Sequence, residues 1–312
     1  MLLLQDARTD QILFLSLFLL VGMSTRDWTL HPEMIAVAIA TCVVTQWVML
    51  AVSSQESEFD SKLHPTAKRK QAISFIFHPS FLASVPSALV TSLGLSILVR
   101  ADHYSTIVLA CVAAIASKFL IRVRGKHLFN PGNFGIVAAL TLTPDAWVSP
   151  GQWGEEGWYA LMFLTCGGLV LRRVGRWDTT IAFLGSYAVL EGIRNVLLGW
   201  TWDVWAHRLM SGSLLMFSLF MITDPRTIPN ARIGRLLWAV AIALLTFFLR
   251  NYLFLSTAVF WALFALAPLS ILIDAMFPGD RFVWSDLLGK KEAGEVGEAE
   301  AQEMTALVTQ IS

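Results

Sequence analysis

The stretch Arg124–Thr141, RGKHLFNPGNFGIVAALT, joins a basic cluster to a turn and then directly to an apolar segment. The turn Asn130-Pro131-Gly132-Asn133 has the composition of a helix start, because Asn caps helix N-termini and Pro suits the first helical position. A second stretch, Thr223–Arg235 (TDPRTIPNARIGR), has the same order of charge, turn residues and apolar segment. Both are typical of places where a chain leaves or enters a membrane, and we expect them to mark the two halves of one fold.

The composition indicates a membrane protein. Of the 312 residues, 55% are hydrophobic and only 15% are charged, with a mean hydropathy of +0.61. Soluble domains carry about 25% charged residues. The zero net charge gives no indication of a nucleic-acid partner. Cys42, Cys111 and Cys166 lie inside apolar runs, so we expect them to be buried thiols and not disulfide or zinc ligands.

Apolar segments predict about ten transmembrane helices. If each segment crosses once from a cytoplasmic N-terminus, 17 Lys and Arg fall in cytoplasmic connections and 5 in outer ones, as the positive-inside rule requires. Lys118 remains inside a helix, where it either extends its amine to the interface or joins a site. The N-terminus lacks the pattern of a signal peptide, so both termini are expected in the cytoplasm. The segments are 11–23, 32–52, 80–99, 105–121, 128–143, 157–171, 179–198, 208–223, 236–249 and 253–275.

Ten crossings divide into two five-helix repeats, and an odd number per half inverts one half relative to the other. The long runs Gln71–Val99, with Pro79 and Pro86, and Asn195–Thr223, with a polar interruption, fall at matching points. Each fits either a re-entrant loop followed by a shortened helix or one long tilted helix. The expected units are a first repeat (1–143), an outer loop (144–156), a second repeat (157–284) and an acidic, flexible cytoplasmic tail (285–312).

The polar residues in the two quoted stretches are the candidates for a functional site. The Asn130 turn either only starts a helix or presents amides and Asn side chains to a ligand within the bundle. Asp224 either stops a helix beside Arg226 or lies near a cation or cofactor path. Glu191 and Arg194, three residues apart, are expected to form a structural pair. His78 and His207 have no second histidine at helical spacing, which argues against haem, and no nucleotide or zinc-hydrolase motif is present.

The segment KHLFNPGNFGIVAAL resembles the FNPAxxG segment of the RnfD and NqrB family. SGSLLMFSLFMITDPRTIPNARIGR resembles the second signature of that family, which leads through FFMATDP to a basic turn, and SALVTSLGLSILVRAD resembles its third-span segment. The resemblance covers most of residues 70–250. It implies an all-α polytopic protein of ten helices, with an inverted-repeat core like that of urea and ammonium channels. It also implies a flavin-binding subunit of a redox-driven ion pump.

One departure from the family concerns flavin attachment. Family members usually attach FMN through a threonine in an SGAT motif, whereas the corresponding loop here reads WVSPGQWGEEGW, without threonine. This loop resembles a stand-alone RnfD-like branch that includes proteins encoded with enediyne biosynthesis genes. We therefore expect that such a member either holds a flavin, FMN or riboflavin, non-covalently between the repeats or has lost flavin altogether. The expected site residues are Asn130, Asn133, Thr91, Ser211 and Asp224, with Lys126 and Arg226 as partners for a phosphate or an anionic flavin.

Three functions remain open from the sequence. The first is electron transfer in a bacterial inner membrane, coupled to ion movement and involving redox partner subunits or an oligomer. The second is a non-redox channel or transporter for a small solute on the same core. The third is an accessory membrane subunit. A bound chromophore separates the first from the others.

Overall fold

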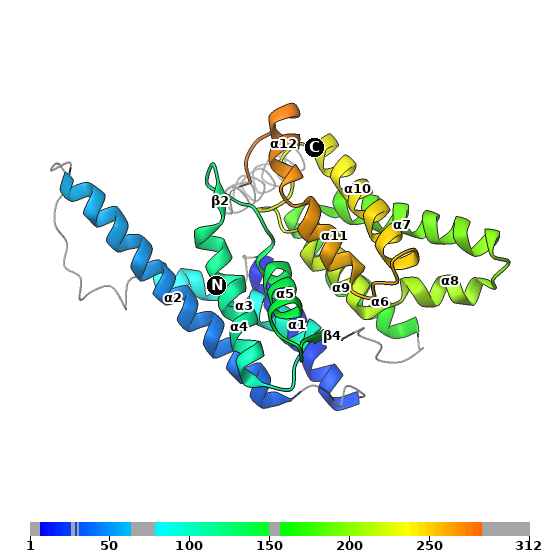
Figure 1. Cartoon of the computed structure of the whole chain (residues 1–312), viewed down its shortest axis with the longest axis horizontal. Coiled ribbons are helices and arrows are strands. Elements are labelled where there is room, and N and C mark those ends of the chain that lie inside the picture. Colours follow the sequence, from blue (N-terminus) through cyan, green and yellow to red (C-terminus); the bar gives the residue numbers. More distant parts are fainter. Residues whose placement is uncertain (1–6, 26–28, 30, 64–78, 150–156, 283–312) are drawn as a thin grey trace, which may run out of the picture.

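The computed structural model describes residues 7–25, 29, 31–63, 79–149 and 157–282, and this part of the chain is mostly helical (Figure 1). Each of the ten predicted apolar segments coincides with a helix or with a pair of short helices. These are α1 (Ala7–Thr25), α2 (Pro32–Leu63), α3 (Pro79–Leu98), α4 (Tyr104–Leu120), α5 (Pro131–Leu142), α6 (Gly157–Val174), α7 (Trp177–Leu197), α9 (Gly212–Met216) with the π-helix η3 (Phe217–Met221), α10 (Arg232–Asn251), and α11 (Ala258–Leu266) with α12 (Leu269–Met276).

Length and composition qualify only some of these helices as complete membrane spans. Pro32–Ser53 within α2, Phe81–Leu98 and Arg232–Asn251 are long and apolar enough, and α11 with α12 forms a fourth candidate bent by 49°. Tyr104–Leu120, Pro131–Leu142 and Gly212–Met221 are apolar but shorter. The described chain is therefore a helical protein with membrane-compatible helices, and the number of ten crossings stays a prediction.

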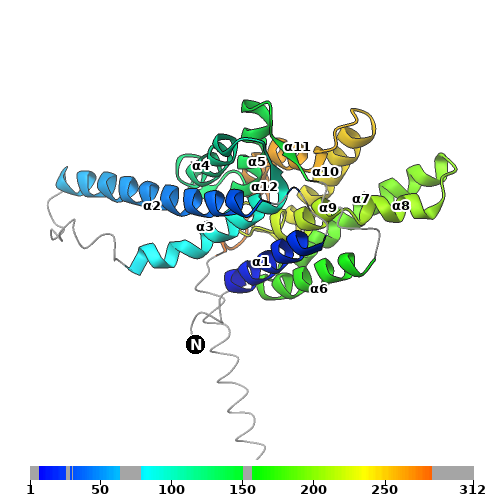
Figure 2. The ribbon, with the colours of Figure 1, turned by 90° about the horizontal axis from the view of Figure 1, so that it is seen from below.

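The two halves pack their helices in the same pairs. In the first half α1 packs on α3, α2 on α4, and α4 on α5. In the second half α6 packs on α9 and η3, α7 on α10, and α10 on α11. The halves meet through α1 with α6 and through α5 with α11, which lie at the centre of the molecule, while α2 and the α7–α8 pair lie at its opposite ends (Figures 1 and 2).

Two pairs of short antiparallel strands lie in the segments that connect the helices. Strand β2 (Arg122–Val123) pairs with β3 (Lys126–His127) around Arg124 and Gly125, both with positive φ, which is the backbone of a type I′ hairpin turn. Strand β1 (Val99–Arg100) pairs with β4 (Trp147–Val148), so the segment after α5 returns to the end of α3. The basic cluster quoted first is therefore a hairpin that leads into α5.

The two matched runs differ in the structure. Helix α3 continues unbroken through Pro86, which fits the alternative of one long helix there, and residues 71–78 lie outside the described residues. Asn195–Thr223 is broken twice, because the amphipathic helix α8 (Trp202–Leu209) separates α7 from α9. Proline breaks a helix only where a lost hydrogen bond and a clash are not accommodated.

The buried core contains apolar side chains from both halves. Phe18 of α1, Phe163 of α6 and Phe220 of η3 pack against one another. The ring centroid of Phe18 lies 4.3 Å from that of Phe163 and 6.0 Å from that of Phe220. All three cysteines are buried free thiols, which confirms that prediction.

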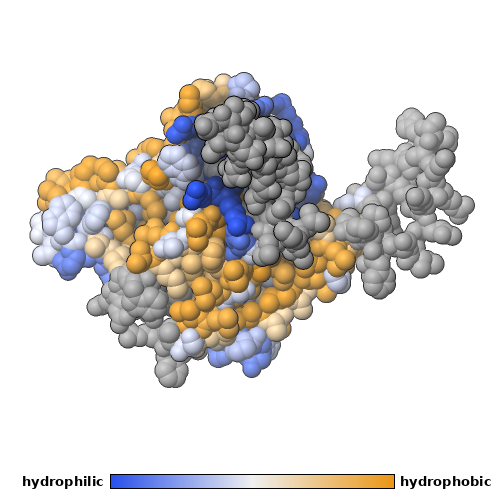
Figure 3. All heavy atoms as spheres, turned by 180° about the vertical axis from the view of Figure 1, so that it is seen from behind, coloured by the Kyte–Doolittle hydropathy of each residue, from blue (hydrophilic) through white to orange (hydrophobic). Residues whose placement is uncertain are grey.

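The apolar surface is extensive: hydrophobic residues form a broad band across the face in Figure 3, whereas hydrophilic residues gather near its upper centre. Such a surface suits lipid contact.

Candidate functional site

The two quoted stretches are in contact, and Asn130 joins them. Its side-chain Oδ1 accepts a hydrogen bond from the Asn133 amide at 3.0 Å and so caps α5. Its Nδ2 donates to the carbonyl of Met221 at 3.2 Å and approaches Asp224 Oδ2 at 3.4 Å. The same side chain thus starts a helix of the first half and binds the end of η3 in the second half.

A cavity of about 140 Å³ lies at this junction. Elements from both halves line it: α1, α3, α4 and the start of α5, together with α6, η3 and the turn that follows η3. Four of the seven predicted site residues are brought together here: Thr91, Asn130, Asp224 and Arg226. The full polar lining comprises Arg8, Gln11, Ser87, Thr91, Lys118, His127, Asn130, Thr223, Asp224 and Arg226.

Lys118 is a charged group buried at this cavity. Only 6% of the residue is exposed. Its Nζ donates to Thr91 Oγ1 at 2.9 Å and to the carbonyl and hydroxyl oxygens of Ser87, each at 3.2 Å. Among the described residues, no ion pair joins Lys118 to a carboxylate. A buried ammonium satisfied by neutral oxygens alone keeps a positive charge available to a ligand.

The cavity lining also includes apolar side chains. Leu15, Val90, Leu98, Val170 and Phe220 contribute to it. The Asp224 carboxylate lines the cavity with its Oδ1 held by the backbone amide of Arg226 at 3.1 Å. The cavity is therefore lined by polar groups, a buried cation, and aliphatic and aromatic side chains. This combination suits a flat molecule with one polar and one apolar edge.

His127, at the end of the β2–β3 hairpin, lies at the rim of the cavity. Burial and the nearby cations Arg122, Arg226 and Lys118 together lower the pKa of its imidazole to about 4. The ring is therefore neutral at neutral pH. Its Nδ1 is buried without a hydrogen-bond partner among the described residues.

Two predicted residues from the first stretch lie outside the cavity lining. Asn133 donates from Nδ2 to the carbonyl of Phe260 at 3.1 Å and so connects α5 with α11. Lys126 forms an ion pair with Asp274 of α12 at 2.6 Å and donates to the carbonyl of Ile228 at 2.5 Å. Both therefore hold the halves together, and in this arrangement neither contacts the cavity.

Ser211 lies in a different pocket, of about 300 Å³, in the second half. Arg208, Arg250 and Thr257 line the same pocket. Ser211 thus belongs to a second polar pocket and does not share a cavity with Thr91, although the two were expected at matching places of the two repeats.

Beside this second pocket a buried carboxylate organises a polar network. Glu191 receives hydrogen bonds from Tyr187 at 2.9 Å and Asn251 at 2.8 Å, and it forms an ion pair with Arg208 at 2.9 Å. The expected Glu191–Arg194 pair is wrong, because the Arg194 guanidinium stacks on Trp200, 4.6 Å from the ring centroid. A tertiary partner from α8 replaces the local one.

The sequence prediction missed six polar residues of the cavity lining: Arg8, Gln11, Ser87, Lys118, His127 and Thr223. Arg8 and Gln11 lie on α1, which no motif marks. Lys118 had a signal, since it is the lone lysine within an apolar segment, but it was not assigned to a site. In the described chain no group of three or more metal-ligating His, Cys, Asp or Glu side chains occurs. His207 lines the second pocket, and His78 lies outside the described residues.

A model of a known protein family matches the second half of the chain. Residues 145–282 match the model of the NQR2, RnfD, RnfE family. The D subunit of the ion-translocating oxidoreductase complex from Actinobacillus pleuropneumoniae serotype 5b is 31% identical over 100 residues, which cover 31% of this chain and 29% of that protein. The corresponding D subunits of Stutzerimonas stutzeri (31% over 123 residues, 39% and 35% coverage) and Halorhodospira halophila (28% over 128 residues, 40% and 35% coverage) are also similar.

These matches span about a third of the length of the curated relatives. The family match includes α9, η3 and Asp224, and thus the segment that carries the second signature. Together with the apolar helices it identifies an integral membrane protein. The resemblance expected from the sequence is thus confirmed: over residues 145–282 the chain is similar to the NQR2, RnfD, RnfE family of membrane proteins.

Proposed function

We propose that this protein is a membrane electron carrier that holds a flavin non-covalently in the cavity between its two halves and works with redox partner subunits. The observation that carries the proposal is the meeting of the FNPGN and TDPR stretches around one cavity that contains a buried cation. The relatives are named as subunits of an ion-translocating oxidoreductase complex, which fits an electron-transfer role.

The residues present fit a flavin. An isoalloxazine has an apolar benzenoid edge and a polar edge with carbonyl and ring-nitrogen groups. Val90, Leu98 and Phe220 provide apolar surface, and Lys118 provides a buried positive charge. The absence of an SGAT motif supports non-covalent binding. A flavin, when bound, supplies one- and two-electron redox chemistry.

In this proposal the residues of the chain position the ring and control its charge. Lys118 donates to Thr91 and Ser87 and stabilises negative charge on the polar edge of the ligand. Asn130 holds the α5 start against η3, so both repeats contribute to one wall. Asp224 and Arg226 also line the cavity, and in this proposal their charges would bind an ion or transfer a proton coupled to electron transfer.

The test begins with an absorbance spectrum of the full chain purified in mild detergent from cells supplied with riboflavin. We expect a band near about 450 nm, and release of the chromophore on denaturation because the attachment is non-covalent. The apoprotein should then bind added riboflavin or FMN. Thr91→Ala should weaken binding about 5- to 10-fold, as expected for loss of one hydrogen bond.

Ser211→Ala is the matched control, because it removes a hydroxyl from the second pocket and leaves the cavity lining intact. Its flavin affinity should equal that of the unmodified protein. A protein that stays colourless after flavin is added back contradicts the proposal. In that case flux of small solutes through proteoliposomes would be measured, since the same fold suits a channel.

A further inference from the structure

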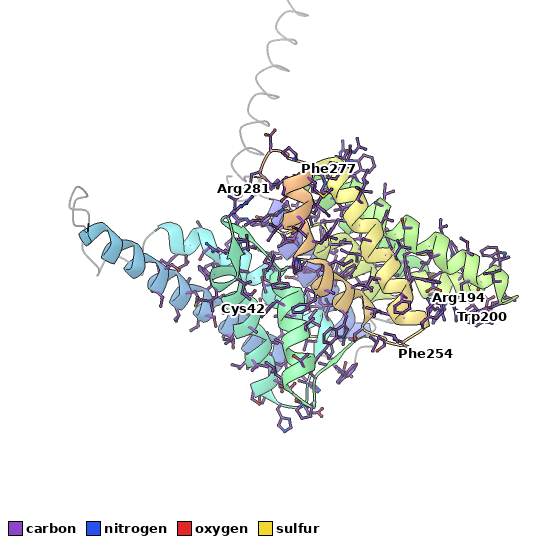
Figure 4. The ribbon with its side chains drawn as sticks, turned by 45° about the horizontal axis from the view of Figure 1, so that its top comes forward. Cys42, Arg194, Trp200, Phe254, Phe277 and Arg281 are labelled. Atoms are coloured by element: carbon purple, nitrogen blue, oxygen red, sulfur yellow. The ribbon has the colours of Figure 1, made fainter. Side chains whose placement is uncertain are left out.

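The corner where α7 turns into α8 carries a second feature, remote from the flavin cavity. Helix α7 ends at Leu197 and α8 begins at Trp202. Between them lies an open depression of about 500 Å³, lined by Gly199, Trp200, Thr201, Val204 and Arg208. Arg194 and Trp200 lie next to one another at this end of the molecule (Figure 4).

Trp200 carries two guanidinium groups. The Arg194 guanidinium lies 4.6 Å from its ring centroid and that of Arg208 lies 5.4 Å away. Arg208 already bonds Glu191 and Asn251 through Nη1, and its side chain remains 25% exposed. Within the described residues, Arg194 is partly exposed and has no carboxylate partner, and its Nη1, which is itself buried, has no hydrogen-bond acceptor. An arginine in this state has bonding capacity for an anion.

The corner is fixed in place by buried contacts. Asn195 is 3% exposed and donates from Nδ2 to the carbonyls of Trp200 and Thr201 at 3.1 and 3.2 Å. Gly199 has a φ of +67°, which allows the tight turn. Trp205 donates to the Ala188 carbonyl at 2.9 Å and so holds α8 against α7. The arginines and the Trp200 ring are therefore held in place before any ligand arrives.

Large apolar side chains surround this corner and point away from the protein. Val196 is 63% exposed, Leu197 80% and Trp202 61%. In a protein of this composition such residues contact lipid chains, and tryptophans collect at the level of the headgroups. Asp203 is also exposed here, and the hydroxyl of Thr201 holds its pKa below the ordinary value. The local charge is thus mixed, with Arg194 as a cation that no carboxylate of the described chain neutralises.

We propose that the α7–α8 corner binds the phosphate group of a membrane phospholipid. The phosphate oxygens accept hydrogen bonds from Arg194 and from the exposed part of Arg208, while the acyl chains lie along Val196 and Leu197. The surrounding apolar surface favours a lipid phosphate over a free one. This inference does not depend on flavin binding and goes beyond electron transfer.

The experiment uses the full chain, purified and stripped of lipid in detergent, and measures the midpoint of thermal unfolding. Dioleoyl phosphatidylglycerol should raise the midpoint by about 5 °C when present about 100-fold above its dissociation constant. Dioleoylglycerol has the same chains without the phosphate and should raise it far less. Inorganic phosphate at the same concentration should have no effect.

Arg194→Gln should abolish the difference between the two lipids, whereas Arg172→Gln, an exposed arginine at the end of α6, should preserve it. Trp200→Leu is the second variant, and it should also reduce the difference between the two lipids, because it removes the ring that both guanidinium groups contact. It provides the test if Arg194→Gln does not fold. Equal stabilisation by both lipids, an equal effect of inorganic phosphate, or a full response in the folded variants would each overturn the proposal.

Discussion

At Lys118, a single buried charge is expected to have opposite effects on ligand binding and on the stability of the fold. Its ammonium is removed from water, and its three hydrogen bonds lead to neutral oxygens of Ser87 and Thr91. Burying an ammonium without a counter-charge is unfavourable, so this residue destabilises the protein in the absence of a ligand. A residue of this kind is expected to have a role in binding, and the lone lysine in an apolar segment was the sequence signal for it.

Lys118→Met is therefore expected to change stability and flavin affinity in opposite directions. Met has similar length and no charge, so the thermal midpoint of the ligand-free protein should stay the same or rise. The dissociation constant for flavin should increase at least about tenfold, because a charge-assisted hydrogen bond contributes about 1.5–3 kcal/mol. Differential scanning fluorimetry and a flavin titration measure the two quantities. A lower midpoint with unchanged affinity would give Lys118 a purely structural role.

His127 makes a pH-dependent contribution to stability. Its folded-state pKa of about 4 lies below the ordinary value of 6.5, because burial and three neighbouring cations disfavour the imidazolium. The unfolded chain then binds more protons than the folded chain below pH 6.5. The stabilisation is fully present above pH 6.5 and is lost as the pH falls towards 4.

His127→Asn should thus flatten the decrease in thermal midpoint between about pH 7 and about pH 5. The shift corresponds to about 1–2 kcal/mol by about pH 5 for this partly buried ring. Midpoints of both proteins measured in the same detergent at several pH values provide the comparison. Parallel profiles for the two proteins would show that His127 does not carry this dependence.

At the scale of the elements, helix contacts depend on small residues that the sequence does not mark as special. Gly135 of α5 faces α4, where a Cβ would lie 2.5 Å from the Ala110 carbonyl oxygen and 2.8 Å from the Ala114 Cβ. Gly168 of α6 has no such neighbour within 4 Å. The first glycine is required by close packing, and the second is not.

Gly135→Ala should accordingly destabilise the protein by about 1–3 kcal/mol, the usual range for overpacking a core contact. Gly168→Ala, the matched control, should be neutral or stabilise by up to about 1 kcal/mol, because alanine is the better helix former. Thermal midpoints of the purified variants decide this. Equal midpoints for both would mean that α4 and α5 separate easily.

The sequence predicted the helices well and the contacts between them poorly. Each of the ten hydrophobic runs coincides with a helical segment, because burial in lipid or protein requires long apolar stretches, although α2 continues to Leu63, well beyond the predicted end at residue 52. Of the two alternatives for the run that contains Pro86, the structure has the continuous helix, because a helix tolerates proline when its neighbours compensate. The Glu191–Arg194 pair failed because a distant partner, Arg208, reached the same carboxylate. Local spacing cannot reveal a tertiary competitor of this kind.

For the candidate site, the sequence motifs correctly predicted the residues that lie in the two turns at the cavity. Asn130 and Asp224 lie in turns with a distinctive composition, and these turns meet at the cavity. Lys126 has the same motif context but pairs with Asp274, 148 residues later in the chain. Arg8 and Gln11 contribute from a helix without a motif. Membership of the cavity thus depends on packing between the halves, which spacing does not encode.

At the scale of the whole molecule, corresponding interactions recur in the two halves. Asp145, which follows α5, accepts from the amides of Asp102 and His103 ahead of α4, at 3.1 and 3.0 Å. Asp274, in α12 after α11, accepts from the amide of Asn230 ahead of α10 at 2.7 Å. Together with the repeated helix pairs, this supports two related five-helix units. If the units are inverted, these two aspartates lie on opposite sides of the membrane.

Inversion makes a definite prediction about exposure on the two sides of the membrane. The distribution of Lys and Arg predicts that the hairpin at Arg124 and the turn at Gly175 lie in the cytoplasm and that the connections at Thr201 and Phe254 lie outside. These four positions lie between helices, and Phe254 is 84% exposed. Single cysteines would be introduced at each in a variant whose three buried native cysteines are replaced by alanine.

A membrane-impermeant maleimide added to intact cells should label T201C and F254C but not R124C or G175C. Inverted vesicles should give the opposite pattern, and detergent should expose all four. The variant without introduced cysteines defines the unlabelled background. If R124C and T201C were labelled from the same side, the chain between them would cross an even number of times. The predicted crossings by α5, α6 and α7 would then be wrong, and with them the equal division into two inverted halves.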